Sequence, residues 1–209
     1  MLQYALLGAT FGFAAAVQPG QLQAFLLART ATRGWRATLP AALAPLLSDL
    51  PIVVLVLLVL THVPAWFLLG LRFAGGLFLL YLAYGAARSW RHYRPPAASD
   101  STGARRTEIE AAFVNLLNPS PYLAWSTVLG PLLIEAWRKA PAAGGALVGA
   151  FYATMITGTV GVIALFALAH SLGPRVGRVL VGVSAIALAA FAVYQLYAGA
   201  SGLRAVLGG

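Results

Sequence analysis

The sequence predicts an all-α integral membrane protein of six transmembrane helices, arranged as two inverted three-helix repeats. Of its 209 residues, 60% are hydrophobic and only 9% are charged, and the mean hydropathy is +0.83. A soluble domain carries about 25% charged residues. The apolar residues fall into six stretches, and the two halves of the chain share polar motifs in the same order. Lipid is therefore the expected solvent for most of the surface.

A helix needs about 20 predominantly apolar residues to cross about 30 Å of hydrocarbon. Six stretches meet this requirement: 2–27, 38–61, 65–87, 109–134, 142–170 and 179–200. Most connections between them are short, but residues 88–108 are polar and rich in Pro and Ser, which indicates a linker. We expect one membrane domain with a first repeat (1–87), a cytoplasmic linker (88–108) and a second repeat (109–209).

The basic residues between the spans predict how the bundle is oriented. Ten of the fourteen lie on one side, at Arg29, Arg33, Arg36, Arg88, Arg91, Arg94, Arg105, Arg106, Arg175 and Arg178. The other four are Arg72, Arg138, Lys139 and Arg204. Because cytoplasmic loops carry an excess of Lys and Arg, the ten are expected on the cytoplasmic side of a bacterial inner membrane, with both termini outside. The same placement at helix ends, rather than in one patch, argues against a nucleic-acid partner.

Two interruptions of the apolar spans carry the repeat. Residues 15–25 read AAVQPGQLQAF and residues 115–125 read NLLNPSPYLAW, so 18–20 falls opposite 118–120. Since each half has three spans, the second half enters the membrane from the opposite side. Such inverted repeats recur in transporters, with the substrate site near the midplane. The alternative is a chance similarity between apolar helices.

Pro19 and Pro119 predict breaks in spans one and four, because proline removes a backbone donor and clashes with the preceding turn. In lipid, such breaks are tolerated only against protein or a wet cavity. The helices that resume after them direct positive N-terminal ends toward the membrane centre, where they attract a carboxylate. The alternative is a pair of kinks that only shape packing. The residues expected to bind substrate at the breaks are Gln18, Pro19, Gly20, Gln21, Asn118, Pro119, Ser120 and Tyr122.

Asp49 is the one carboxylate expected well inside a span, bracketed by Pro45 and Pro51. An ionised carboxylate at the bilayer centre costs about 2.5–3.5 kcal/mol, and such residues are usually functional. Asp49 is expected to bind a substrate ammonium, to carry a coupling proton, or to alternate between them. The alternative is a cap for a helix restarting at Pro51. Thr157 in span five is expected to offer a hydroxyl to the same cavity, unless it bonds to its own helix.

Small residues in span five predict close helix packing. They are Gly144, Gly145, Gly149, Gly158 and Gly161. The chain has no cysteine, which excludes disulfides and thiolate metal sites. The spans show no nucleophile–base pair and no metal-ligand cluster, so we expect neither an enzyme nor a cofactor.

Four motifs resemble the lysine exporter (LysE) and homoserine/threonine exporter superfamily. Pro19-Gly20 falls on the Pro-Gly-Pro signature of the first span, and Asp49 on the acidic position of the second. Residues 75–81 (GGLFLLY) fall on the Gly-rich motif of the third span, and Asn118-Pro119 on the Asn-Pro signature of the fourth. The resemblance covers nearly the whole chain. It implies a six-helix inner-membrane exporter of amino acids or related molecules, driven by the proton gradient.

Two positions depart from the pattern of that family. Gln21 replaces the second proline of the first signature, and Ser120 replaces the lysine that commonly follows Asn-Pro. The resulting Asn-Pro-x-Pro-Tyr form resembles a separate branch. The substrate therefore does not transfer with the resemblance, and lysine is disfavoured because one buried acid would have to bind two ammonium groups.

The sequence thus predicts a secondary transporter that exports amino acids or similar small polar metabolites by proton-coupled antiport and alternating access. The alternative is an exporter of inorganic or divalent cations, for which a homodimer would double the single intramembrane carboxylate. A lesser alternative is a membrane protein without transport activity. The expected partners are a small-molecule substrate, protons and the lipid bilayer.

Overall fold

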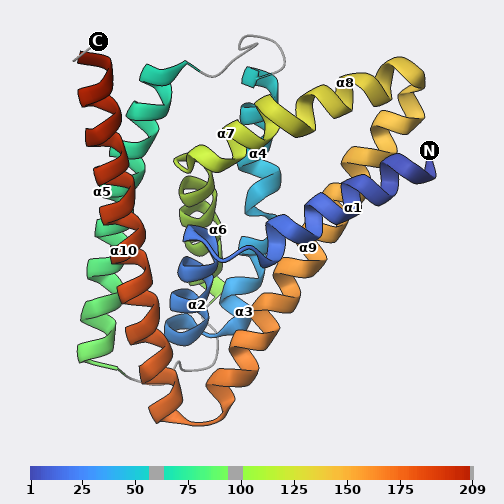
Figure 1. Ribbon diagram of the computed structural model, residues 1–209. Coiled ribbons are helices and arrows are strands. Elements are labelled where there is room, and N and C mark those ends of the chain that lie inside the picture. Colours follow the sequence, from blue (N-terminus) through green and yellow to red (C-terminus); the bar gives the residue numbers. More distant parts are fainter. Residues whose placement is uncertain (57–63, 94–100, 208–209) are drawn as a thin grey trace.

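The computed structural model describes residues 1–56, 64–93 and 101–207. Every regular element within these ranges is a helix (Figure 1), which confirms the predicted all-α class for this part of the chain. In chain order the helices are α1 (Leu2–Val17), α2 (Gln21–Arg33), α3 (Trp35–Thr38), η1 (Leu39–Leu43), α4 (Ala44–Val54), α5 (Ala65–Arg91), α6 (Ser101–Leu116), α7 (Pro119–Ala124), η3 (Trp125–Leu129), α8 (Gly130–Lys139), α9 (Pro141–Ser171) and α10 (Pro174–Leu207).

Four segments are long and apolar enough to cross a membrane. They are Trp35–Val54, Trp66–Arg91, Pro141–Ser171 and Pro174–Arg204. The first of them is built from α3, η1 and α4, which follow one another without a gap. The predicted end of this span, residues 57–61, lies outside the described residues. At about 1.5 Å per residue, the 31 residues of α9 extend over about 46 Å, more than the hydrocarbon thickness.

The other two predicted spans are each divided into shorter helices. α1 ends at Val17 and α2 begins at Gln21, so the chain is broken around Pro19. Likewise α6 ends at Leu116 and α7 begins at Pro119. α1 and α8 run obliquely outward on the same side, whereas α2 and α6 stand at the centre of the bundle (Figure 1).

The predicted linker is more helical than its composition suggests. α5 extends to Arg91 and α6 already begins at Ser101, so both ends of the range 88–108 are helical. One cause is an ion pair at i,i+4 between Arg106 and Glu110, which supports the first turns of α6. Residues 94–100 lie outside the described part of the chain.

α1 and α9 approach each other closely. A Cβ atom added to Gly8 would lie 2.1 Å from the carbonyl oxygen of Leu147, and one added to Gly12 would lie 2.2 Å from that of Phe151. Only glycine fits at such distances. Gly8, Gly12 and Ala16 follow a small-xxx-small pattern, which brings helix backbones together in membranes.

Only some of the glycines predicted to mediate packing from span five lie against a neighbouring helix or side chain. Gly144 lies against Trp137 and Gly158 against Ala16, as close packing requires. The other three have no atom within 4 Å of an added Cβ: Gly145, Gly149 and Gly161. The tight contact is therefore made by glycines of α1 lying on the backbone of α9, rather than by most of the glycines of α9 itself.

A small polar cluster joins α1 to the end of α8. Glu135 accepts hydrogen bonds from the Tyr4 hydroxyl at 3.0 Å and from Lys139 Nζ at 2.8 Å. These two contacts, the one with Lys139 foremost, hold the pKa of Glu135 below its usual value. The contribution of Glu135 to stability is therefore present at neutral pH and is lost as the pH falls through that lowered pKa.

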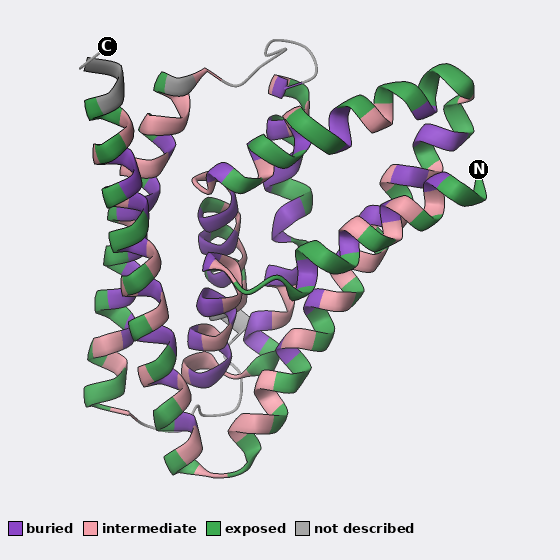
Figure 2. Cartoon of the chain, in the orientation of Figure 1, coloured by how far each residue is buried: buried purple, intermediate pink, exposed green. Residues whose placement is uncertain are grey.

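The outward faces of α5, α9 and α10 are exposed over most of their length (Figure 2). Many of the exposed side chains there are large and apolar, including Leu77, Leu165, Leu168, Ile186 and Val193. Extended exposed apolar surfaces mark contact with another apolar phase. Together with the length of these helices, they are suited to contact with lipid.

Basic residues gather at one end of the bundle. The turn at Gly34, the end of α5 and the turn at Gly173 all lie toward this end (Figure 1). Gly34 has φ 84° and Gly173 has φ 127°, values that favour glycine over other residues. Arg33, Arg36, Arg88, Arg91, Arg175 and Arg178 lie in or next to these segments, and we call this the arginine end.

Candidate functional site

A cavity of about 380 Å³ lies between the two helix breaks. Its wall is made by residues from both halves of the chain, including parts of α1, α2, α4, α6 and η3. Seven of the predicted site residues line it: Gln18, Pro19, Gly20, Gln21, Asp49, Asn118 and Ser120. The structure therefore brings most of the predicted site together around one space.

Asp49 is the charged residue of this cavity. It lies on α4 with only 4% of its surface exposed. The side-chain amide of Asn115, on α6, donates a hydrogen bond of 2.6 Å to Asp49 Oδ1 and one of 2.8 Å to Ser48 Oγ. The Tyr152 hydroxyl of α9 lies 3.4 Å from Asp49 Oδ2. The carboxylate is thus held by donors from the second half of the chain.

Asp49 does not cap a restarting helix. α4 continues without interruption from Ala44 to Val54 and has Pro51 in its interior. A capping residue precedes the first helical turn and accepts hydrogen bonds from its backbone N–H groups. The geometry contradicts the capping alternative and leaves the carboxylate oxygens directed at Asn115 and Tyr152.

The first break exposes the start of α2 to the cavity. Gly20 precedes α2 in an extended conformation, with no side-chain cap. The first N–H groups of a helix have no intrahelical acceptor and carry a partial positive charge. Gln21, Leu22 and Gln23 form this first turn, and all three line the cavity. Gln23 Nε2 also donates to the carbonyl of Ala16 at 2.8 Å, across the break.

The second break is closed by its own side chains. Asn118 Oδ1 accepts a hydrogen bond of 3.1 Å from the backbone N–H of Ser120, so Asn118 caps α7. The Tyr122 hydroxyl donates to the carbonyl of Leu116 at 2.9 Å. Tyr122 and Pro119 are buried beside the cavity and are not among the residues that line it.

Thr157 lies on the exposed side of α9. Its hydroxyl donates to the carbonyl of Ala153 at 2.8 Å, within its own helix, and it does not line the cavity. Thr159, two residues later, is 1% exposed and does line it. The predicted contact between Thr157 and a substrate stays a prediction.

Sequence reasoning missed Asn115, although a signal was present. It is a second amide in the same apolar stretch, one helical turn before Asn118. The apolar part of the wall had no such signal, because apolar side chains occur throughout every span. This part includes Phe11, Trp125, Phe151, Met155 and Phe191.

Within the described residues, no three His, Asp or Glu side chains gather in a way that could hold a metal ion. Comparison with known proteins gives one result that covers most of the chain. The family model described as LysE type translocator matches residues 13–199. No curated protein and no solved structure matches the chain.

Proposed function

Since the chain belongs to the LysE type translocator family, and is accordingly an integral membrane transport protein, we propose that it exports amino acids across the bacterial inner membrane by proton-coupled antiport. The observation that carries this proposal is Asp49, buried in a cavity between two helix breaks and held by Asn115. An intramembrane carboxylate facing a cavity is characteristic of substrate and proton pathways.

The two ends of the backbone portion of an amino acid find complementary groups in this cavity. Asp49 supplies a negative charge for the ammonium group. The uncapped first turn of α2, at Gln21, supplies backbone N–H groups and a positive helix end for the carboxylate. Both features line the same wall. A zwitterion therefore satisfies the site better than a simple cation or anion does.

The remaining wall favours an apolar side chain. Phe11, Trp125, Phe151, Met155 and Phe191 offer aromatic and thioether surface, and 380 Å³ lies within the range of small-molecule pockets. Among the described lining residues, Asp49 is the single carboxylate. A second ammonium group, as in lysine, would remain without a partner, which is costly in a buried site. The proposed substrates are neutral amino acids with apolar side chains.

Proton coupling follows if Asp49 binds either a proton or the substrate ammonium, but not both. A proton arriving from outside neutralises the carboxylate and releases the substrate there. Loss of that proton to the cytoplasm restores the charge that binds the next substrate. In this proposal the arginine end faces the cytoplasm, as the excess of positive charge favours.

Alternating access is supported by a pairing of helices across the two halves. α1, which opens the first half, packs along α9, and α6, which opens the second, packs against η1 and α4. In the proposed inverted repeat, α1 corresponds to α6 and the α3–η1–α4 segment to α9. The same contact then occurs twice, as a pseudo-two-fold axis in the membrane plane requires.

The test uses purified protein in liposomes loaded with labelled L-leucine, L-methionine, L-phenylalanine or L-lysine. An imposed pH gradient should drive release of at least one of the first three amino acids, with proton movement in the opposite direction reported by an enclosed pH dye. Asp49→Asn should abolish both signals. Glu135→Gln, which makes the same chemical change at an exposed acid, should retain them. Release of lysine alone, or full activity of Asp49→Asn, would refute the proposal.

A further inference from the structure

A second cavity, of about 300 Å³, lies toward the arginine end between α2, α5 and α6. Three guanidinium groups line it: those of Arg29, Arg88 and Arg106. Among the described lining residues there is no carboxylate. The central cavity, by contrast, has Asp49 and no basic residue in its wall. The charged groups that line the two cavities are therefore of opposite sign.

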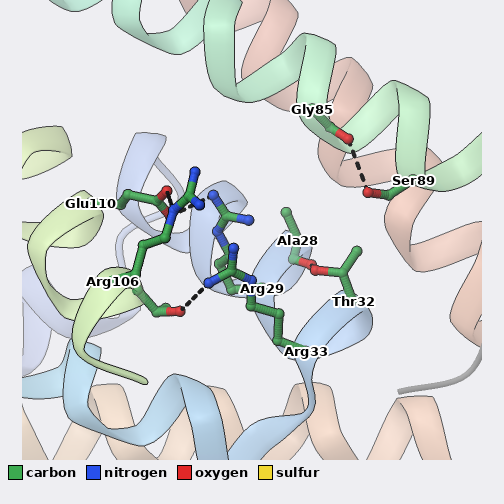
Figure 3. Close-up of polar contacts among 9 residues, drawn as sticks. Ala28, Arg29, Thr32, Arg33, Gly85, Ser89, Arg106 and Glu110 are labelled. Carbon is green, nitrogen blue, oxygen red and sulfur yellow. Dashed lines mark hydrogen bonds and ion pairs between the residues drawn. The ribbon is translucent and has the colours of Figure 1, made fainter. Parts of the chain in front are cut away.

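Glu110 compensates only part of this positive charge. Its two oxygens pair with Arg29 of α2 and with Arg106 of its own helix, so that a single carboxylate is shared by two cations (Figure 3). Arg33, one turn further along α2, donates a hydrogen bond to the Thr107 hydroxyl at 3.4 Å. Three lining guanidiniums less one carboxylate leave two positive charges in excess at the wall.

The charged groups of the cavity that keep free hydrogen-bonding capacity are donors. Arg29 Nε is buried and makes no hydrogen bond within the described structure. Arg88 makes no ion pair with any described carboxylate. The hydroxyls of Thr32 and Ser89 donate to carbonyls of their own helices, at 2.7 and 3.0 Å, and they carry no charge. The cavity thus offers guanidinium N–H groups to a ligand and little that would attract a cation.

We propose that this cavity binds an oxyanion, specifically a phosphate group, through Arg29, Arg88 and Arg106. Guanidinium groups bind phosphate through paired, charge-assisted hydrogen bonds. The phosphate belongs either to a soluble ion or to an anionic lipid headgroup. Tyr81 and Tyr84 also line the cavity and are 58% and 69% exposed. Tyrosine is enriched at the level of the lipid headgroups. This site is separate from the central cavity and does not depend on the transported substrate.

Occupancy would join the two halves of the chain at this end. Arg29 and Arg88 lie on α2 and α5, and Arg106 lies on α6. A phosphate held by all three replaces repulsion among the guanidiniums with attraction. The expected effect is a more stable protein when the anion is bound, because a ligand of the folded state raises the unfolding temperature.

The experiment measures the unfolding temperature with inorganic phosphate, in neutral detergent, at an ionic strength held constant with chloride. A second arm uses nanodiscs of phosphatidylcholine with or without phosphatidylglycerol. The variant is Arg88→Gln, which leaves the ion pairs of Glu110 intact. The matched control is Arg91→Gln, which removes the same charge from the same helix one turn further on and outside the cavity.

Phosphate should stabilise the wild type and Arg91→Gln alike, and Arg88→Gln should need about tenfold more phosphate for the same shift. If phosphatidylglycerol alone gives this Arg88-dependent stabilisation, the proposal holds and the ligand is a lipid headgroup. Equal responses of Arg88→Gln and Arg91→Gln in both arms would overturn it, since they would indicate only nonspecific attraction. The absence of any stabilisation of the wild type would overturn it as well.

Discussion

Asn115 is the residue whose removal tests the central site most directly. Its amide donates the shortest hydrogen bond to Asp49, 2.6 Å, while the Tyr152 hydroxyl lies at 3.4 Å, near the limit for a hydrogen bond. A hydrogen bond to a charged group contributes about 1.5–3 kcal/mol. Asn115→Ala should therefore weaken substrate binding by about 10- to 100-fold. Tyr152→Phe should change it by less than about threefold.

The assay is release of the amino acid identified in the liposome experiment, measured over a range of concentrations for each variant. Asn115→Ala should raise the half-saturating concentration, and the double variant with Tyr152→Phe shows whether the two donors act together. Gln195→Ala is the matched control, since Gln195 is a buried amide of α10 that does not line the cavity. The reasoning fails if Asn115→Ala binds like the wild type, or if Tyr152→Phe has the larger effect.

Three further predictions concern stability, measured as unfolding temperature in detergent. Gly12→Ala should destabilise the protein by about 1–3 kcal/mol, because its Cβ would overlap a carbonyl of α9. Gly145→Ala, whose Cβ would meet open space, should leave the stability unchanged. Equal losses of stability in the two variants would contradict the α1–α9 contact. Glu110→Gln should destabilise the protein by about 3 kcal/mol or more, since it leaves the largely buried Arg29 without its partner. Glu135→Gln, at an exposed acid, should destabilise it clearly less. The reverse order would be incompatible with the burial of the Arg29–Glu110 pair. Asn118→Ala should cost about 1 kcal/mol through loss of the α7 cap. An unchanged unfolding temperature would contradict that cap.

The features that could be predicted from the sequence are those with a local physical cause. Pro19 and Pro119 each follow a polar amide and precede a small residue, a combination that favours a break in the helix, so the two breaks are visible in the sequence. Asp49 is conspicuous because a carboxylate is costly in an apolar span. Both signals depend on a few neighbouring residues and not on the rest of the fold.

Other features depend on which helices meet. Gly8 and Gly12 look like ordinary small residues until α9 is placed against them. Glu110 reads as a polar residue beside the linker at the start of the fourth predicted span, yet it is 8% exposed and pairs with Arg29 of α2. Thr157 and Thr159 are indistinguishable in sequence, and only the rotation of α9 decides which of them faces the cavity.

The contact between α1 and α9 has a mechanical consequence. With carbonyl groups of α9 occupying the space where side chains at Gly8 and Gly12 would be, the two helices can neither slide nor separate without losing that fit. In the proposed transport cycle they would therefore move as one rigid unit, with residues 18–20 as the hinge at the end of α1. α6 packs against η1 and α4. In the proposed transport cycle, each moving unit would take its helices from both halves of the sequence, so the boundary between moving parts would not coincide with the boundary between the proposed repeats.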